Sequence, residues 1–317
     1  MDTLLLTGDD YTALVSMDDC IAAVEGAFRE HGSGTVSAGI LSTHVHGGAF
    51  HIKSAMLSRY FAAKLNANFP GNAPLPTIQG LLVLFDAGNG RPLAVIDSIE
   101  LTRQRTAAAT AVAAKHLARR DSATVAVYGC GAQAGAQLEA LARVLPLRRG
   151  TVTDVDTARA EAFAEETGRR LGLDLRPGAG PADVVVTCTT SRQPFLRREH
   201  VAAGAFVAAV GADNPEKAEI DPELMRASVV VADVLEQCAV IGDLRAAIAA
   251  GAMTRDGVRA ELGAIVAGRA EGRRGDDETI VFDSTGAGFQ DTAAAAIAYE
   301  RAVARERGLR ISFRRNP

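Results

Sequence analysis

The stretch "VAVYGCGAQAGAQLEAL", Val125 to Leu141, decides the fold of this chain. An apolar strand runs through a glycine turn straight into a helix, which is how a βαβ unit begins. The small positions read G-x-G-x-x-A and are Gly129, Gly131 and Ala134. The first glycine permits the tight turn, the second lets a pyrophosphate approach, and the third small residue lets helix and strand pack closely. The stretch predicts a dinucleotide-binding loop, with a plain βα turn as the alternative.

An acidic residue ends the next expected strand, "TVTDV". Asp154 stands at about the distance from the glycines at which an acid meets the ribose hydroxyls of a dinucleotide. A carboxylate there repels a 2′-phosphate, so the sequence favours NAD(H) as cofactor over NADP(H). Asp156 is the alternative residue for this role.

Strands and helices alternate beyond the glycine loop. Four further apolar runs, "DVVVTCT", "AFVAAVG", "SVVVAD" and "TIVFDST", are separated by longer and more polar stretches. This order predicts an α/β fold with a Rossmann-type, doubly wound parallel sheet. Ligands of such sheets bind at the carboxyl ends of the strands, so residues that follow these runs are candidates for the site.

The earlier part of the chain has a different rhythm. "SMDDCIAAVEGAFREHGSG" predicts a helix capped by Ser16 or Asp18. Five short apolar or alternating runs then predict an antiparallel meander, in which Asn89-Gly90 indicates a hairpin. A long alanine-rich helix is expected from about Leu101.

This change of rhythm predicts two domains. The last helix, over 289–307, lies beyond the final parallel strand and is free to return to the first domain. We therefore expect an α+β substrate and dimerisation domain over 1–118 with 289–317. A cofactor-binding Rossmann domain is expected over 119–288.

Composition narrows the class of protein. The 317 residues are 48% hydrophobic and 23% charged, with a formal net charge of -4, which is typical of a globular protein without a nucleic-acid surface. The four cysteines are far apart, which disfavours a disulfide framework or a zinc site. The start of the chain does not resemble a signal peptide, and no apolar run is long enough to span a bilayer. A cytoplasmic location is expected.

Six motifs in order resemble the ornithine cyclodeaminase/mu-crystallin family, which includes an alanine dehydrogenase and several ketimine reductases. They are "KLNANFPGN", "LPTIQGLLVLFDAGNGRPLAVID", "LTRQRTAAATAVAAKHLAR", "VYGCGAQA", "VGADNPEKAEID" and "VFDSTGAGFQD", and they cover most of the chain. The resemblance implies a two-domain homodimer that uses NAD(H) and a small amino-acid or imino-acid substrate.

The resemblance also assigns residues. Lys64 and Arg105 bind the substrate carboxylate, and Asp213 moves a proton on or off the substrate nitrogen; Lys64 and Asp213 are the expected catalytic pair. Thr77 matches a further substrate-binding position. The cofactor-binding residues expected from the loop, from the strand ends and from the resemblance are Gly129, Gly131, Ala132, Gln133, Asp154, Thr189, Val210, Ser284 and Gly286. The resemblance places Ser284 and Gly286 near the nicotinamide.

General chemistry agrees with this assignment. Hydride transfer at the α-carbon of an amino acid needs a cationic clamp for the carboxylate and a group that handles a proton on nitrogen. Two arginines, Arg103 and Arg105, are expected in the first turn of the long helix, where the helix dipole disfavours cations. They point about 200° apart, so one site cannot use both. The family pattern selects Arg105, and Arg103 is expected at a solvated or dimer-contact position.

The chain departs from the family in the first long strands. Residues 33–57 contain no arginine, and Lys53-Ser54 stands where Met-Pro is expected. We expect Lys53 to share the binding of the carboxylate or to meet a second acidic group, with a solvent-facing lysine as the alternative. His44 and His46 share a strand face, but pocket or surface positions are favoured for them and for His51, and no metal is expected.

Three reactions remain open at this point. The favoured one is an NAD(H)-dependent ketimine reductase or amino-acid dehydrogenase. The alternative is an ornithine or lysine cyclodeaminase, in which the hydride returns and ammonia is released. The third is a non-catalytic NAD(P)H- or ligand-binding protein, because fold does not fix function.

Overall fold

The computed structural model describes residues 2–34 and 36–313, which form two compact units. Unit 1 comprises Met1–Arg105 with Ala287–Pro317, and unit 2 comprises Thr106–Gly286. The division falls inside helix α3 (Ser98–Leu117), whereas the sequence boundary was expected at the end of that helix.

Unit 1 is built on a seven-stranded sheet of order β15-β1-β6-β5-β4-β3-β2. Strands β2 to β6 pair antiparallel in chain order, which confirms the predicted meander. β1 is parallel to β6 and antiparallel to β15. The strands are β1 (Thr3–Leu6), β2 (Ser37–Val45), β3 (Gly48–Leu57), β4 (Tyr60–Asn68), β5 (Ile78–Asp86), β6 (Pro92–Asp97) and β15 (Leu309–Ile311).

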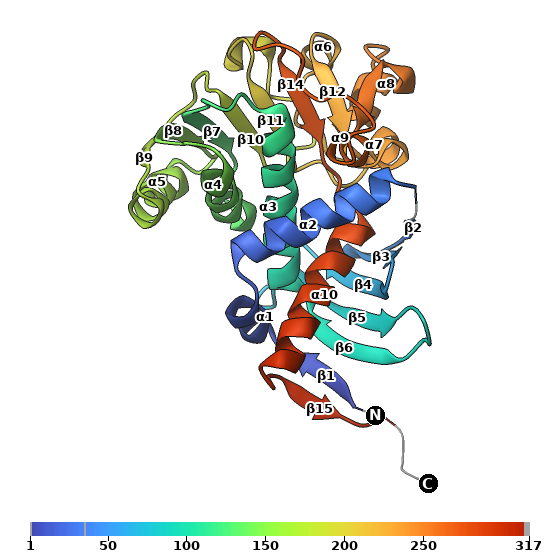
Figure 1. Cartoon of the computed structure of the whole chain (residues 1–317). Helices are drawn as coiled ribbons and strands as arrows, with labels where there is room; N and C mark the ends of the chain where they lie inside the picture. Colours follow the sequence, from blue (N-terminus) through green and yellow to red (C-terminus); the bar gives the residue numbers. More distant parts are fainter. Residues whose placement is uncertain (1, 35, 314–317) are drawn as a thin grey trace. The chain divides into compact units, whose positions relative to one another are not determined.

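One long helix covers the sheet of unit 1, and a second long helix packs on it. Helix α10 (Gly288–Ala304) lies against β3, β4 and helix α2 (Met17–Gly32), as Figure 1 shows, and short helix α1 (Gly8–Leu14) lies beside its far end. Ser16 caps α2 in a reciprocal box with Asp19, in agreement with the predicted start. A Cβ added at Gly288 would lie 2.7 Å from the Ser54 carbonyl oxygen, so glycine lets the first turn of α10 approach β3.

Helix α3 begins at Ser98, three residues before the expected Leu101, and this corrects one prediction. The Ile99 amide donates to the Asp97 carboxylate at 2.8 Å at this end of the helix. Arg105 is therefore in the second turn of the helix, beyond the first turn where the dipole is most positive. Arg103 Nε donates to Glu100 Oε2 at 2.8 Å on the helix surface, so its position does not impose the electrostatic strain that the sequence suggested.

Unit 2 is a doubly wound sheet of order β13-β12-β14-β11-β10-β7-β8-β9, and every pairing in it is parallel. The predicted Rossmann architecture is confirmed. Its strands are β7 (Thr124–Tyr128), β8 (Arg149–Thr153), β9 (Asp174–Pro177), β10 (Val184–Thr187), β11 (Phe206–Ala209), β12 (Val229–Ala232), β13 (Val258–Glu261) and β14 (Ile280–Asp283). Its helices are α4 (Ala132–Val144), α5 (Thr157–Leu171), α6 (Pro222–Arg226), α7 (Leu235–Ile241), α8 (Asp243–Ala249) and α9 (Leu262–Val266), with single 3-10 turns at Arg198–His200 and Arg255–Gly257.

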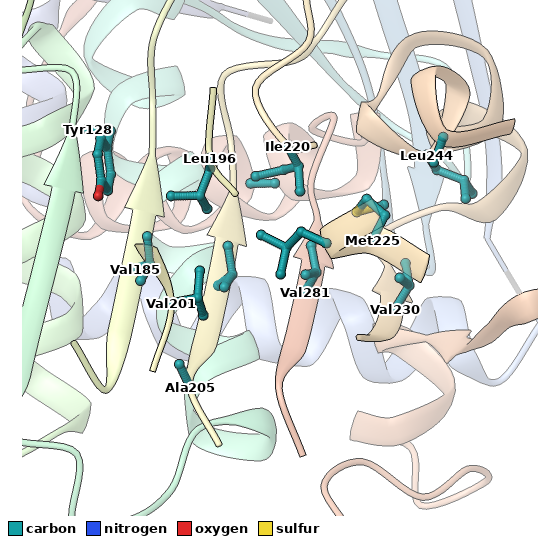
Figure 2. Close-up of a cluster of buried hydrophobic side chains, with 14 of the residues drawn as sticks. Tyr128, Val185, Leu196, Val201, Ala205, Ile220, Met225, Val230, Leu244 and Val281 are labelled. Carbon is teal, nitrogen blue, oxygen red and sulfur yellow. The ribbon is translucent and has the colours of Figure 1, made fainter. Parts of the chain in front are cut away.

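The core of unit 2 explains why its central strands read as continuous apolar runs. Figure 2 shows part of one apolar cluster, in which Val185 of β10 and Val281 of β14 meet side chains from the connecting segments such as Ile220 and Met225. Both faces of a parallel sheet are covered, so its strands are apolar throughout. The edge strands β9 and β13 were not predicted, because their side chains are mostly exposed or half-buried and polar.

Candidate functional site

Three charged side chains form a buried cluster in unit 1. Lys64 Nζ and Arg105 Nε each lie 2.8 Å from the same oxygen, Asp291 Oδ1. Lys64 also donates to Thr102 Oγ1 at 3.1 Å, and Arg105 Nη1 donates to Gln290 Oε1 at 2.9 Å. The side chains of Lys64, Arg105 and Asp291 are 4%, 5% and 1% exposed. Since water is largely excluded, each charge is stabilised by the opposite charges beside it.

Three elements position this cluster. Lys64 projects from the middle of β4, Arg105 from the second turn of α3, and Asp291 from the first turn of α10. The amino end of α10 favours a carboxylate, because the helix dipole is positive there. The structure thus brings together the two cations that the sequence assigned to carboxylate binding.

Burial and charge shift the titration of this cluster. Burial, with the positive charge of Arg105, lowers the pKa of Lys64 to about 7 although Asp291 opposes this shift. Burial alone would raise the pKa of Asp291, but Arg105 and Lys64 hold it below its usual value. Asp291 is therefore an anion at neutral pH, while Lys64 stands close to its titration point.

The glycine loop of unit 2 has the geometry that its spacing predicted. Gly129 has a φ of 95°, and a Cβ there would lie 2.8 Å from the Cys188 carbonyl oxygen, so the turn requires glycine. Gly131 is the N-cap of α4 without a side-chain cap, and a Cβ there would meet nothing within 4 Å. Ala134 is fully buried where the helix packs. Exposed N–H groups at this helix start suit a phosphate.

Asp154 is tied to this loop. Its Oδ2 accepts from the Cys130 amide at 2.8 Å, and its Oδ1 accepts from the Asp156 amide at 3.0 Å. Burial alone would raise the pKa of Asp154, but these amides and the guanidinium of Arg159 lower it. Asp156 instead caps helix α5. The geometry favours Asp154 over Asp156 as the ribose acceptor. Burial raises the pKa of the Cys130 thiol to about 11, so this side chain is a neutral thiol at neutral pH.

The other expected cofactor residues of unit 2 follow its strands. Ala132 and Gln133 open α4, Thr189 follows β10 and Val210 follows β11. Ser284 and Gly286 follow β14, where the Gly286 amide donates to Asp233 at 2.7 Å. The carboxyl ends of the parallel strands therefore carry these positions.

Asp213 also follows the carboxyl end of a parallel strand in unit 2. It lies four residues after β11, its side chain is 53% exposed, and its Oδ1 accepts from Lys217 Nζ at 2.8 Å. A half-exposed carboxylate can exchange protons with a substrate nitrogen, which is the role that the resemblance assigns to it.

Glu219 was not predicted from the sequence. It is fully buried, and it accepts from both the amide and the hydroxyl of Thr189 and from the Gly211 amide. Thr187 Oγ1 donates to it at 2.7 Å. Glu219 thus fixes the loops that follow β10 and β11. It stands in "KAEID", where apolar and charged residues alternate as they do in many ordinary loops and strands. This pattern does not distinguish Glu219 from a surface residue, so its structural role was not predictable.

A second group of carboxyls is buried beside Glu219. Asp243 Oδ1 accepts from the amides of Glu219 and Ile220 at 2.7 and 2.9 Å, and the Leu244 amide donates to Asp283 at 2.8 Å. Burial and the negative charge of Glu219 raise the pKa of Asp243 to about 7. These acids hold backbone amides in place and take part in the packing of unit 2.

The remaining sequence candidates lie on the sheet of unit 1. Lys53 is half-buried on β3 and is the direct register partner of Lys64. His51 Nδ1 and Ser42 Oγ are 2.9 Å apart, and the His44 ring centroid lies 6.4 Å from that of His51. His46 lies beyond the end of β2. Among residues 2–34 and 36–313, no group of three or more metal-ligating side chains is clustered.

Thr77 is not brought to the Lys64 cluster within unit 1. It is exposed and immediately precedes β5, where its carbonyl accepts from the Phe69 amide at 2.8 Å. Leu82, five residues later, is the register partner of Lys64, so Thr77 stands roughly 17 Å away along the strand. Its substrate-binding role stays a prediction.

Asp291 is the principal residue that sequence reasoning missed. The motif "VFDSTGAGFQD" contains it, and both Gln290 and Asp291 are buried in the structure. An acid in an otherwise alanine-rich, apolar helix start was the available signal. Within the described part of the chain, no helix is both long and apolar enough for a membrane span.

The glycine loop, its acidic neighbour and the parallel sheet define a dinucleotide-binding protein, here joined to a unit with a buried cation–carboxylate cluster. The chain belongs to the ornithine cyclodeaminase/mu-crystallin family, whose model matches residues 1–306. This confirms the family expected from the six sequence motifs.

Similar proteins cover the whole length of the chain. An alanine dehydrogenase of Archaeoglobus fulgidus is 37% identical over 319 residues, 99% of each chain. A structure of an archaeal alanine dehydrogenase dimer with bound NAD matches with a TM-score of 0.96 at 36% identity, covering 99% of this chain and 100% of that one. The Δ1-pyrroline-2-carboxylate reductase of Thermococcus litoralis, in complex with NADH and L-proline, matches with a TM-score of 0.93 at 31% identity, covering 98% and 100%.

Proposed function

We propose that this protein is an NAD(H)-dependent oxidoreductase that transfers hydride at the α-carbon of a small amino or imino acid, as a ketimine reductase or amino-acid dehydrogenase. The observation that carries the proposal is the pair of buried cations, Lys64 and Arg105, held on Asp291 in a chain that also has a dinucleotide loop. Relatives that bind NAD or NADH and act on amino or imino acids support it.

The residues of unit 2 fit the cofactor. The amides at the start of α4 would bind the pyrophosphate, and Gly131 gives it room to approach. Asp154 would accept the ribose hydroxyls, and its negative charge disfavours a 2′-phosphate. Ser284 and Gly286 would lie on the nicotinamide side. When bound, NAD(H) supplies or accepts the hydride.

The residues of unit 1 fit the substrate carboxylate. Arginine offers a planar fork for bidentate binding, and Lys64 adds a point charge. Because both side chains are held by Asp291 before substrate arrives, little of their freedom is lost on binding. The carboxylate would thereby fix the position of the adjacent α-carbon.

Reduction of a protonated imine balances as follows. The hydride forms a C–H bond at the α-carbon, the C=N π pair moves to nitrogen, and NADH becomes NAD⁺. An unprotonated imine takes up one additional proton, and the reverse reaction releases it. Asp213 would carry this proton, because its half-exposed carboxylate can exchange protons with solvent.

A cyclodeaminase remains the second candidate. In that reaction the hydride returns to the substrate and ammonia leaves, so no net NADH is formed. The loop "YGCGAQ" and the segment "GADNPEK" favour the reductase and dehydrogenase side of the family. A non-catalytic ligand-binding protein is the third candidate, and the retention of Lys64, Arg105 and Asp213 together disfavours it.

We also propose that the protein is a homodimer that uses the open face of the unit 1 sheet. Along β2 to β5, the face opposite α10 carries a set of large apolar side chains that are all at least 36% exposed. They are Leu41, Val45, Phe50, Met56, Phe61, Leu65 and Leu81. Leu41, Leu65 and Leu81 stand in one cross-strand row with Ile52. A contiguous apolar face of this kind marks a protein interface.

One assay separates the three functions. Purified protein is incubated with NAD and L-amino acids, and with NADH plus 2-oxo acids and ammonium or with cyclic imines, while NADH absorbance and ammonia are followed separately. Net NADH turnover supports the proposal. Ammonia from ornithine without net NADH change would replace it with cyclodeamination, and no turnover with any substrate would favour the binding protein.

A further inference from the structure

Glu219 holds two loops of unit 2 with one carboxyl group. Its Oε1 accepts from the Thr189 amide at 2.6 Å and from the Thr189 hydroxyl at 2.7 Å. Its Oε2 accepts from the Gly211 amide at 2.8 Å and from the Thr187 hydroxyl at 2.7 Å. Thr189 follows β10 and Gly211 follows β11, so one side chain ties together the carboxyl ends of two neighbouring parallel strands.

The glycine at position 211 makes this contact possible. A Cβ at Gly211 would overlap the carboxyl group of Glu219. The backbone of Gly211 does not have the left-handed conformation that favours glycine, so the close approach of the carboxyl group is what requires a glycine here. An alanine at this position would push the carboxyl group away from the amides that donate to it.

The backbone of Glu219 is fixed independently of its side chain. The Glu219 amide donates to Asp243 Oδ1 at 2.7 Å. Its carbonyl oxygen accepts from the amides of Phe195 and Leu196, each at 2.9 Å. A change confined to the carboxyl group should therefore leave the path of the chain at position 219 in place. The effect of such a change can then be traced to the two loops.

Each of the two loops leads to a functional position. A Cβ at Gly129 would lie 3.0 Å from Thr189 Cγ2, so Thr189 packs against the first glycine of the dinucleotide loop. Gly211 stands two residues before Asp213, the proposed proton carrier. The contacts of Glu219 therefore join the dinucleotide loop to the segment of Asp213 within unit 2.

We propose that Glu219 is a positioning residue for hydride transfer, which sets the spacing between the dinucleotide loop and the segment of Asp213 without touching the reactants. This inference rests on the proposed function, because these two groups belong to it. A carboxyl group is required, since each of its oxygens accepts from a backbone amide. Glutamine offers one oxygen and one NH2 group, so one of the two amides would face a donor.

The kinetics of Glu219→Gln test this role, with NADH and with NADH deuterated at both C4 positions. The substrate is the one that the screen of amino and imino acids identifies. kcat should fall by about 10- to 100-fold, the usual cost of leaving a buried amide unsatisfied, and the Kd for NADH should rise. The deuterium effect on kcat should increase, because hydride transfer becomes slow relative to product release.

Asp183→Asn is the matched control. Asp183 Oδ2 accepts from the amides of Ala123 and Thr124, each at 3.0 Å, and from the Thr124 hydroxyl at 2.8 Å. Asp183 precedes β10, so it repeats the construction of Glu219 at the amino end of the same strand. In the variant, the NH2 group would face either Arg119 or these amides, which should lower the melting temperature. NADH affinity and the isotope effect should stay at their wild-type values.

Gly211→Ala reaches the same carboxyl group from the other side. It keeps every polar group of the two loops, and it should reproduce the lower kcat, the weaker NADH binding and the larger isotope effect. The double variant with Glu219→Gln should lose little more than either single variant, because both disrupt one contact. Gly211→Ala carries the test alone if Glu219→Gln does not fold.

The outcomes separate a positioning role from a purely structural one. A smaller folded fraction lowers the measured activity but changes neither the isotope effect nor the Kd for NADH. Wild-type values of both in folded Glu219→Gln or Gly211→Ala, or the same changes in Asp183→Asn, would overturn the positioning role and leave the oxidoreductase intact. No turnover by the wild-type protein overturns the proposed function, and fluorescence titration with NADH then still shows whether Glu219 holds the dinucleotide loop.

Discussion

Lys64 Nζ lies 2.8 Å from Asp291 Oδ1, although the two residues are 227 positions apart in the chain. This contact joins the middle of a strand to the first turn of the last long helix of unit 1. Lys64 is therefore held by a residue that lies far from it in the linear sequence. The consequences for folding and for activity can be separated by mutation.

Replacement of Asp291 by asparagine should destabilise the protein strongly. It leaves Lys64 and Arg105 buried without their shared carboxylate, and breaking a buried ion pair in this way costs about 3–5 kcal/mol. Chemical denaturation measures the loss. Asp121→Asn, at a side chain that is 88% exposed, is the control and should change stability by less than about 0.5 kcal/mol. Equal stability of the two variants would show that Asp291 does not support the cluster.

The kinetics of carboxylate substrates should depend on Lys64 near neutral pH. Its folded-state pKa of about 7 lies below the unfolded value of about 10.4, so the folded protein loses this proton first. kcat/KM should fall as pH rises through about 7 to 8, because the neutral amine no longer attracts a carboxylate. Stability changes in the opposite sense: it rises with pH in this range, since the unfolded chain still binds the proton.

Lys64→Arg provides the check on that assignment. An arginine stays protonated throughout this range, so the basic inflection in kcat/KM should disappear if the variant retains measurable activity. An unchanged inflection would assign it to another group.

Arg105→Ala and Arg103→Ala should behave differently although the residues are two apart. Arg105 is buried on Asp291, so its loss should raise KM for the substrate at least 10-fold while NAD affinity is retained. Arg103 is paired with Glu100 on the helix surface, and such pairs contribute less than about 1 kcal/mol. Steady-state kinetics and NAD titration of both variants measure this difference. Similar losses in both would contradict the assignment of Arg105.

Gly129→Ala and Gly131→Ala should separate folding from cofactor binding. The Cβ of an alanine at position 129 would lie too close to the Cys188 carbonyl oxygen, and the backbone at this position is left-handed. Both effects should lower the stability of the variant. Alanine at position 131 finds space within the protein, so that variant should melt normally but bind NAD less tightly. Thermal melting and fluorescence titration with NADH distinguish the two effects. Normal NADH affinity in Gly131→Ala would place the pyrophosphate elsewhere.

Removal of the buried Asp243 carboxyl should flatten the dependence of stability on pH. Its folded-state pKa of about 7 exceeds the ordinary value of 3.8, so the folded protein holds a proton that the unfolded chain has released. This contribution is present at low pH and is lost as pH rises toward 7. In Asp243→Asn the amide oxygen can still accept from the Glu219 and Ile220 amides, and denaturation at pH 5 and pH 8 should show a smaller difference than in wild type.

Patterns of local sequence predicted most of the fold. The central strands of unit 2 and the meander of unit 1 were recognisable because buried parallel strands are apolar throughout and hairpins are marked by turns such as Asn89-Gly90. The start of α3 was placed three residues late, because Asp97 supplies an acceptor at the helix start that the alanine-rich pattern did not reveal. The edge strands β9 and β13 lack an apolar signature.

The site was predicted less completely than the fold. Lys64 and Arg105 were found through motifs, but their common partner Asp291 depends on the return of α10 to the sheet. Glu219 was missed for a similar reason, since its role arises from strands β10 and β11 ending side by side. Contacts between distant segments are set by tertiary packing, and a single sequence does not display them.

The open apolar face on β2 to β5 has a consequence for handling the protein. If two copies cover this face, the folded state is linked to subunit concentration by mass action. The melting temperature should then rise with protein concentration, and dilute samples should adhere to surfaces or precipitate. Strand β2 is the edge strand of the sheet, and all nine of its residues are exposed in the single chain. Adhesion and precipitation would therefore begin at β2.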